Sequence, residues 1–447
     1  MIRIKKGIDL PLSGAPEQKI SGEFKPTRVA VTAIDYVGMK PKMNVSVGDS
    51  VVAGQCLFVD KKYPSIQFTA TTSGKVVEIN RGAKRLLHSV VIETSGNEQV
   101  SYQNYKSSDL QNLNRENVVA LLLESGLWPA LRTRPFSKSP DPESTPAAIF
   151  VNAMDTHPLC ADPALIIGEN APHFEMGLKV LTKLTQGKLY LCKKHGTTLP
   201  GEDLVSLNVQ SFEGPHPAGL SGTHMHFIDP VSINRTHWSI GYQDVLRVGE
   251  LFATGVQSFA GYISLAGPKV NTPTILKTKL GACLCQLVKD RISTDNTRVI
   301  SGSVLDGRTK SDGLCYLGRF HNQVTVVEEG NKREFLGWHA PGFEKFSVKN
   351  VFISRLFSGK KFNFNTNTNG SPRSVVPVGS YEKVMPLEIL ATPLIKSLLT
   401  GNTDFAQSLG CLELDEEDLA LLTYVCPSKI DFGPVLRDSL EKIEKEG

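Results

Sequence analysis

Two stretches decide the fold of residues 1–100: Met43-Asn44-Val45-Ser46-Val47-Gly48-Asp49-Ser50-Val51-Val52-Ala53-Gly54-Gln55 and Thr72-Ser73-Gly74-Lys75-Val76-Val77-Glu78-Ile79. Their valines lie in short runs that are separated by Gly48, Gly54 and Gly74. Each run is too brief for a helix, and glycine favours turns because its backbone tolerates conformations that other residues avoid. The region from Val29 to about Thr94 is therefore predicted to be all β, with its valines facing a small shared core.

The same two stretches resemble the barrel-sandwich hybrid of biotinyl and lipoyl carrier domains, and residues 1–100 are assigned to this fold. Carrier domains present a modified lysine between the two halves of the barrel, and Lys61 and Lys62 lie at that place here. The neighbouring Phe58-Val59 and Tyr63-Pro64 do not match the residues that flank the carrier lysine. A free-standing carrier enzyme therefore remains a third alternative and not the favoured one.

Residues 101–256 have the pattern of an open, Rossmann-like α/β domain. Asn114 can cap a first helix, which Gly126 would end. Buried apolar runs predict strands, and apolar residues at helical spacing predict the helices between them. The predicted strands are Ala147–Val151, Lys188–Cys192, Leu207–Phe212 and His224–Ile228, and the predicted helices are one striped by Phe174, Leu178 and Leu181 and one at Asp244–Phe252.

The remaining sequence divides into two further parts. Residues 257–380 resemble a soluble-ligand-binding β-grasp module, with strands near Gly261–Ala266 and Thr274–Thr278 and a short helix that ends at Val288. Added strands are expected near Val299–Val304 and Gln323–Val327, and Lys361–Arg373 is predicted to be a mobile loop because it is rich in Asn, Thr and Ser. Residues 381–447 are predicted to be helical, with starts at Thr392, Asp415 and Gly433 and stops at Gly401 and Gly410.

Composition excludes several classes of protein. Lys and Arg number 49 against 45 Asp and Glu, so the formal charge of +4 provides no field for nucleic acid. No apolar run approaches the roughly eighteen residues that cross a bilayer, and the N-terminus lacks the apolar stretch of a signal peptide. Eight cysteines include no Cys-x-x-Cys pair, which argues against a disulfide framework and a zinc ribbon. We expect a protein inside the cell, in a reducing compartment, whose membrane association comes from partner proteins.

Four segments carry a resemblance to a known family: Met1–Gly14, Glu78–Arg85, Gly214–Leu220 and Gly318–Gln323. Together with the domain order, they resemble the A-subunit family of bacterial sodium-translocating NADH:quinone oxidoreductases. That family is related to the NADH- and flavin-binding subunit of respiratory complex I and to the Rnf-type C-subunit, with the barrel placed first. The similarity spans essentially the whole chain.

The resemblance implies membership of a six-subunit translocase of the bacterial inner membrane. This complex belongs to the respiratory chain and couples electron transport from NADH to ubiquinone to sodium transport. NADH oxidation, the flavins, the iron–sulfur centres and sodium passage are implied to reside in partner subunits. The chain is expected to lie peripherally on the cytoplasmic side, held by membrane and peripheral subunits and especially by the B-subunit. The NADH:ubiquinone reductase activity then belongs to the complex, and no catalytic residue is expected here.

The segment that forms a glycine-rich flavin loop in complex I relatives has a different character here. It reads Gly126-Leu127-Trp128-Pro129-Ala130-Leu131-Arg132-Thr133-Arg134-Pro135-Phe136-Ser137-Lys138. Two prolines remove N–H donors, and only Gly126 leaves the backbone bare, so a nest of amides around a phosphate is not expected. Arg132, Arg134 and Lys138 could bind an anion through their side chains, but a basic loop that meets a partner or water is the simpler interpretation.

The iron–sulfur motif of the relatives is lost as well. A ferredoxin-like run ending at Cys426-Pro427 would need cysteines at positions that hold Glu416, Leu419 and Leu422. We therefore expect neither flavin nor iron–sulfur binding, and a packed helix in place of the cluster. Cys283 and Cys285 are interpreted as small buried side chains in a helix or its approach.

Two sets of candidate site residues follow. A quinone needs an apolar cleft and a few hydrogen-bond donors, and Tyr36, Met39, Lys40, Phe136 and Lys138 offer such groups. The favoured hypothesis is a chain without its own tightly bound redox cofactor that helps to shape quinone access and assembly. The alternative is a subunit with its own ubiquinone site. His224 and His226 on one strand face, with His216 in the preceding loop, are weak metal candidates, and structural histidines are the simpler interpretation.

Overall fold

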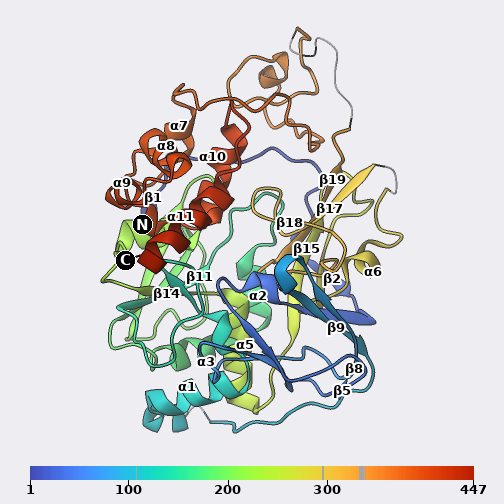
Figure 1. Cartoon of the computed structure of the whole chain (residues 1–447), viewed down its shortest axis with the longest axis vertical. Helices are drawn as coiled ribbons and strands as arrows, with labels where there is room; N and C mark the ends of the chain where they lie inside the picture. Colours follow the sequence, from blue (N-terminus) through green and yellow to red (C-terminus); the bar gives the residue numbers. More distant parts are fainter. Residues whose placement is uncertain (107, 294–295, 332–336, 338, 447) are drawn as a thin grey trace.

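A computed structural model describes residues 1–106, 108–293, 296–331, 337 and 339–446 of the chain (Figure 1). Within these residues the strands form four sheets, and the C-terminal helices gather together at the upper left of the view (Figure 1). The barrel-sandwich hybrid, the α/β domain, the β-grasp module and the helical region are all present as predicted. Among the described residues, no helix has the length and apolar character that crossing a membrane requires.

The barrel is built from one four-stranded and one three-stranded sheet, ordered β3-β9-β8-β5 and β4-β6-β7. Its core includes Leu57, Ile66 and Val90, which are fully buried. Gly48, Gly54 and Gly74 all have positive φ angles, which explains why glycine occupies these turns. The strands are β3 (Arg28–Thr32), β4 (Pro41–Met43), β5 (Ser50–Val51), β6 (Cys56–Asp60), β7 (Gln67–Thr69), β8 (Gly74–Arg81) and β9 (Leu87–Thr94).

The α/β domain has a six-stranded sheet in the order β1-β13-β12-β11-β14-β10. All neighbours are parallel except β10, which pairs with β14 in antiparallel fashion. Because β12 and β13 lie on one side of β11 and β14 on the other, the strand order reverses between β11 and β14. The strands are β1 (Ile2–Arg3), β10 (Arg132–Arg134), β11 (Ala148–Ala153), β12 (Lys188–Lys194), β13 (Leu207–Glu213) and β14 (His237–Gly241).

Helices α3 and α5 of this domain cross at two glycines. A Cβ at Gly249 would lie 1.7 Å from the His173 carbonyl oxygen, and one at Gly177 would lie 2.2 Å from that of Val245. Only glycine therefore permits this close approach of the two backbones. The helices are α1 (Arg115–Glu124), α2 (Pro163–Glu169), α3 (Ala171–Leu181), α4 (Ser221–Ile228) and α5 (Tyr242–Thr254).

The predicted strand at His224–Ile228 is wrong, because this segment is helix α4. Two consecutive turns after Pro215 wind the chain, and the His224 amide then donates to the Leu220 carbonyl at 3.1 Å. Alternation over three residues was too short to distinguish a strand from a helix. The strand that completes this side of the sheet is β14, which the sequence did not predict.

The β-grasp module has its own six-stranded sheet, ordered β18-β17-β19-β15-β16-β2. Its core includes Ile263, Leu265 and Leu284. The predicted strands and the short helix are present. The elements are β15 (Ala260–Ala266), β16 (Thr274–Lys279), α6 (Leu284–Val288), β17 (Thr297–Ser301), β18 (Arg308–Thr309) and β19 (Gln323–Glu328).

The chain before the barrel contributes strands to two other sheets. β1 pairs with β13 of the α/β domain, with Ile2 opposite Phe212. β2 (Ile20–Glu23) pairs with β16 of the β-grasp module, with Ile20 opposite Ile275. The first residues therefore tie the α/β domain and the β-grasp module to the segment that leads into the barrel.

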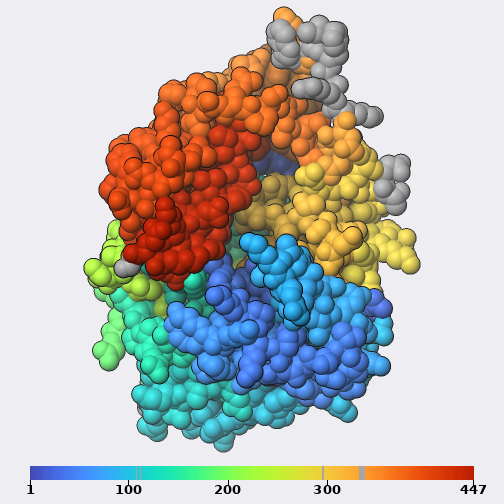
Figure 2. Space-filling view, viewed as in Figure 1, coloured from blue at the N-terminus to red at the C-terminus, as the bar shows by residue number. Residues whose placement is uncertain are grey.

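The C-terminal region is helical and packs around an apolar core (Figure 2, red and orange). Leu419 and Leu422 are fully buried in it, as expected for a packed helix at this place. Gly401 ends α8 with a φ of +68°, and Asp415 caps the turn Glu416–Leu419 together with Asp418. The helices are α7 (Ser380–Val384), α8 (Ala391–Thr400), α9 (Thr403–Ser408), α10 (Ala420–Val425) and α11 (Phe432–Glu446).

The interpretation of Cys285 as a buried single thiol is wrong. Its side chain is exposed and forms a disulfide with Cys315, which is 30 residues away in sequence. The backbone brings the two segments together, because the Leu284 amide donates to the Cys315 carbonyl and the Leu317 amide to the Ala282 carbonyl, both at 2.9 Å. Cys283 is buried, as predicted.

Candidate functional site

The basic loop contacts the turn Glu416–Leu419 of the C-terminal region. The Arg134 side chain, on β10, is buried, and its Nη1 lies 2.7 Å from Asp418 Oδ2. Its Nη2 lies 3.7 Å from both Asp415 Oδ2 and Glu417 Oε1. The Ser137 hydroxyl donates to Asp415 Oδ2 at 2.5 Å. The basic loop is thus bound to the turn Glu416–Leu419 and to its capping residue Asp415.

Helix α11 completes this network through Arg437. Its Nη2 lies 2.7 Å from Asp415 Oδ1 and 2.6 Å from Glu416 Oε2, and its Nη1 donates to the Phe136 carbonyl at 2.8 Å. Burial disfavours the charged form of Asp415, but Arg134, Arg132 and Arg437 hold its pKa well below its usual range. Arg437 therefore neutralises the Asp415 carboxylate and also links the loop to helix α11.

The expectation that the basic loop meets a partner or water is wrong for Arg134, because its partners are carboxylates of the same chain. Arg132 is also near them, at 3.9 Å from Asp415 and from Glu417, and it stacks over the Phe320 ring at 4.8 Å. Lys138 Nζ lies 2.5 Å from Glu444 Oε2 of α11. All three basic side chains are therefore engaged within the chain.

A polar cavity of about 130 Å³ lies beside the carboxyl ends of β11 and β14. This is the point where the strand order reverses, which is where open α/β sheets bind ligands. Asp244, Arg247 and Arg319 line the cavity, and Asp244 Oδ1 lies 2.7 Å from both Arg247 Nη1 and Arg319 Nη2. Two guanidinium groups share one carboxylate, so this wall of the cavity has an excess of positive charge.

A second ion-pair group joins the α/β domain to the β-grasp module near this cavity. His157 Nδ1 lies 2.7 Å from Asp155, and its Nε2 lies 3.3 Å from Asp306 Oδ2. Burial opposes protonation, but the two carboxylates raise the pKa of His157 well above its ordinary value. The neighbouring ring of His216 is 4.9 Å away, and burial lowers the pKa of that histidine to about 3.

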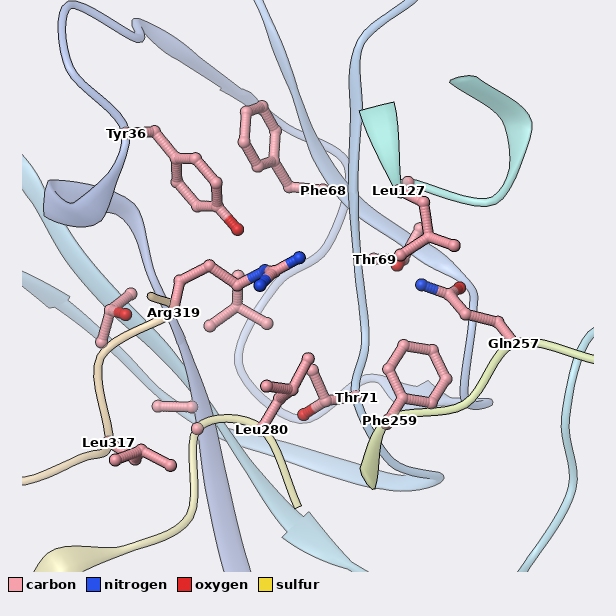
Figure 3. A pocket seen from close by; sticks show the side chains of 15 residues that line it. Tyr36, Phe68, Thr69, Thr71, Leu127, Gln257, Phe259, Leu280, Leu317 and Arg319 are labelled. Carbon is pink, nitrogen blue, oxygen red and sulfur yellow. The ribbon is translucent and has the colours of Figure 1, made fainter. Parts of the chain in front are cut away.

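A smaller cavity of about 40 Å³ lies between the barrel and the β-grasp module (Figure 3). The hydroxyl of Tyr36, the guanidinium of Arg319 and the amide of Gln257 point into the same space in Figure 3. Phe68 packs on Tyr36, with ring centroids 4.6 Å apart, and burial raises the pKa of Tyr36 to about 12. Such a volume holds roughly three water molecules, which is too small for a quinone ring.

The two predicted quinone segments, 36–40 and 136–138, contact each other along a boundary that we call the seam. A Cβ at Gly38, between Tyr36 and Met39, would lie 2.8 Å from Cε of Lys138. Met39 packs on the barrel core and Phe136 on the helical core, whereas Lys40 is exposed. Of these five side chains, only Tyr36 lines either of the two cavities. The structure brings the segments together but does not enclose their side chains in one pocket.

Sequence reasoning missed Arg319, which lines both cavities. Its segment, Gly318-Arg319-Phe320-His321, carries part of the family resemblance, but no local pattern indicates that the arginine reaches Asp244. The barrel lysines, Lys61 and Lys62, lie in the turn between β6 and β7, and Lys62 stacks over the Tyr63 ring at 4.9 Å.

The three histidines proposed as weak metal candidates have separate partners. His224 Nε2 lies 2.9 Å from the Ala218 carbonyl oxygen, and His216 Nδ1 lies 3.1 Å from the Thr156 hydroxyl. His226 contacts Glu413 at 2.8 Å and accepts from the Glu388 amide. Because His224 and His226 lie two residues apart on a helix, their side chains do not share a face. Each of the three histidines therefore has its own polar partner within the chain.

The chain combines a barrel-sandwich hybrid, an open α/β domain, a β-grasp module and a helical region, in that order. Together these parts define a class of modular, multidomain subunit. Models of three protein domains match it: the NqrA N-terminal barrel-sandwich hybrid domain at residues 2–95, the NqrA second alpha/beta domain at 113–257, and the NQRA C-terminal domain at 262–312.

Whole-length relatives are consistent with these matches. The chain is 53% identical to the Na(+)-translocating NADH-quinone reductase A-subunit of Pseudomonas aeruginosa (strain UCBPP-PA14) and 54% identical to those of Pasteurella multocida and Vibrio vulnificus, each over 100% of both chains. The chain therefore belongs to the NqrA family, the A-subunits of Na(+)-translocating NADH-quinone reductases. A solved NAD+-reducing [NiFe]-hydrogenase aligns over 52% of both chains with 13% identity and a TM-score of 0.33, which is too low to carry an argument.

Proposed function

We propose that the chain is a peripheral, cytoplasmic-side subunit of a sodium-translocating NADH:ubiquinone reductase, and that it shapes quinone access and assembly without a redox cofactor of its own. Family membership supports the place in the complex. The reductase activity then belongs to the assembly, in which partner subunits carry the flavins and the iron–sulfur centres.

One observation carries the proposed absence of a cofactor. Arg134 and Ser137 bind Asp415 and Asp418, so the flavin-loop position and the cluster position fill each other's space with ion pairs. A flavin phosphate would have to displace buried carboxylates from Arg134, which would leave Asp418 without its counter-charge. The arrangement favours a structural contact over a binding site.

An absorption spectrum of the isolated, folded chain tests this part of the proposal. We expect no visible band after purification and after incubation with flavin mononucleotide followed by desalting. A stoichiometric flavin or iron–sulfur spectrum would overturn it.

An exposed apolar segment supports docking on membrane subunits of the complex, the B-subunit above all. Leu356 has 81% of its surface exposed, and Val351, Phe343 and Phe357 are each more than half exposed. The rings of Phe343 and Phe357 also contact each other, with centroids 6.5 Å apart. Large apolar side chains gathered in one exposed segment are typical of a protein interface.

The docking role predicts a specific loss of assembly. The double variant Leu356→Ser, Phe357→Ser should fold but fail to remain with the complex during purification from membranes. Val205→Ser is the matched control, because Val205 is fully exposed but lies in a different segment. Retention of the double variant at the level of the control would refute this docking surface.

The quinone role rests on the seam at which Gly38 meets Lys138. The small cavity beside Tyr36 cannot enclose a quinone ring, and charged groups line the larger cavity. A surface that is completed by a membrane subunit is therefore the arrangement that these dimensions favour.

The alternative is a ubiquinone site within this chain, and one observation favours it. Thr71 Oγ1 and Gln257 Oε1 line the smaller cavity and have no hydrogen-bond partner within the part of the chain that the structure describes. With Tyr36 and Arg319 opposite, they are polar groups that a quinone could use once the cavity opened.

Calorimetry of the purified chain with a soluble short-chain quinone separates the two possibilities. A private site predicts saturable heat that Tyr36→Phe weakens and Tyr105→Phe does not, because Tyr105 packs on Phe252 and lines neither cavity. The favoured proposal predicts no saturable heat for the isolated chain.

A further inference from the structure

Three cysteine side chains gather at the edge of the β-grasp module. Cys283 and Cys285 lie at the start of α6, and Cys315 lies in the segment that pairs with them. Their sulfur atoms all lie within 4.8 Å of one another. Among the residues that the structure describes, no other three Cys, His, Asp or Glu side chains are grouped in this way.

The backbone holds these thiols in place. Hydrogen bonds join residues 282 and 284 to residues 317 and 315, and the Cys283 amide donates to the Arg28 carbonyl of the barrel at 3.2 Å. Cys283 also packs in a small apolar cluster with Ala30, Val91 and Tyr316. The group therefore sits on two paired segments at the boundary between the β-grasp module and the barrel.

The Cys285 and Cys315 sulfurs are bonded to each other in the disulfide, and the Cys283 sulfur lies within 4.8 Å of both. A zinc–thiolate bond is about 2.3 Å long, which places tetrahedral sulfur ligands about 3.8 Å apart. Reduction breaks the sulfur–sulfur bond, so these two sulfurs can then move apart to that spacing. Three thiolates satisfy the preference of d10 ions for soft ligands, and the exposure of Cys285 leaves a fourth position open to water.

We propose that Cys283, Cys285 and Cys315 form a three-thiolate binding site for Zn²⁺ in the reduced chain. The disulfide between Cys285 and Cys315 is the oxidised form, in which only Cys283 retains a thiol. A dithiol reductant supplies two electrons and two protons. The sulfur–sulfur bond then breaks, two thiols form, and the reductant becomes a disulfide. Zinc binding releases the three thiol protons to water and forms three metal–sulfur bonds.

Zinc binding at this site would affect the contact between the β-grasp module and the barrel, because Cys283 takes part in both. In the oxidised form Cys283 packs against the barrel as a cysteine outside the disulfide, whereas in the zinc-bound form its sulfur is a ligand. Oxidation and metal binding exclude each other because both use Cys285 and Cys315. This proposal does not depend on the proposed quinone role.

The test uses the full chain, reduced with a dithiol, desalted under anaerobic conditions and titrated with Co²⁺ as a spectroscopic substitute for zinc. We expect one equivalent to produce sulfur-to-cobalt charge-transfer absorption, which Zn²⁺ then removes. The oxidised chain should give no such absorption until it is reduced. Absence of saturable absorption from the reduced chain would overturn the proposal.

Variants identify the ligands. Cys285→Ser should weaken metal binding by at least the roughly 10- to 100-fold that loss of a mere supporting partner costs. Because Cys285 is exposed, this change should leave the circular dichroism spectrum unchanged. Cys56→Ser is the control, since that half-buried thiol lies in the barrel outside the cluster. Equal affinities for the two variants would refute the assignment, and Cys315→Ser should behave like Cys285→Ser.

Discussion

Arg134 Nη1 donates to Asp418 Oδ2 at 2.7 Å, across a separation of 284 residues in sequence. One partner lies in the basic loop that follows α1, and the other lies in the turn Glu416–Leu419. Either side chain alone would be a buried charge, and together the two neutralise each other.

Removing the cation should strongly destabilise the helical region. Arg134→Met leaves Asp418 buried without its cation, and breaking a buried ion pair costs about 3–5 kcal/mol. Urea unfolding followed by circular dichroism measures the loss. Lys445→Ala removes only an exposed pair within α11 and should change the unfolding free energy by less than about 1 kcal/mol. Similar effects from the two variants would contradict a central role for Arg134.

The crossing of α3 and α5 should not tolerate a single added methyl group. Gly249→Ala places a Cβ 1.7 Å from a backbone oxygen, so the helices must separate at a cost of about 1–3 kcal/mol or more. Gly168→Ala on α2 is the control, because its added Cβ meets no atom within 4 Å. The control should be neutral or stabilise by up to about 1 kcal/mol. Differential scanning calorimetry should therefore show a lower melting temperature for Gly249→Ala and an unchanged or higher one for Gly168→Ala.

The ion-pair group of His157 should make stability depend on pH above neutrality. Its folded-state pKa is raised above the ordinary value of 6.5, so its contribution is full below that pH and is lost as pH rises through the folded-state pKa. Wild type should lose stability relative to His157→Gln as pH rises above about 6.5 and through the raised folded-state pKa of His157. Parallel pH profiles for the two chains would contradict a raised pKa of His157 beside Asp155 and Asp306.

The seam at Lys138 predicts a selective kinetic defect in the assembled complex. Lys138→Ala should lower quinone reduction about fivefold if the side chain contributes about 1 kcal/mol at the quinone end. NADH oxidation with a soluble artificial acceptor should be unchanged, because the proposal places that step in other subunits. Lys445→Ala serves as the control, because Lys445 lies beside Glu444, the partner of Lys138, but pairs with Glu441. A parallel decrease in both activities would indicate a general assembly defect instead.

Local patterns predicted most of the fold. Gly48, Gly54 and Gly74 marked the barrel turns because only their backbones adopt positive φ angles without strain. Asp415 marked a helix start because its side chain can accept from exposed amides. The strand β14 was not predicted because His237 and Ser239 are polar but buried. The strand therefore has neither an alternating nor a continuously apolar pattern.

The contacts at the site could not be predicted from the sequence, for a different reason. Arg134 and Asp418, or Arg319 and Asp244, are brought together by the packing of separate domains, which no local spacing encodes. The thiol cluster has the same origin, since Cys315 reaches Cys285 through the pairing of two loop segments. The sequence showed which residue types stand at these positions, but it could not show which side chains they contact.

The strands that precede the barrel have a consequence for biosynthesis. β1 and β2 are made before the barrel, yet their neighbours β13 and β16 begin at residues 207 and 274. The barrel can close during translation, whereas β1 and β2 must wait, unpaired, until these later strands have been made. Nascent chains of this family therefore carry two unpaired sheet edges for much of their synthesis, and these edges are where a chaperone would find them.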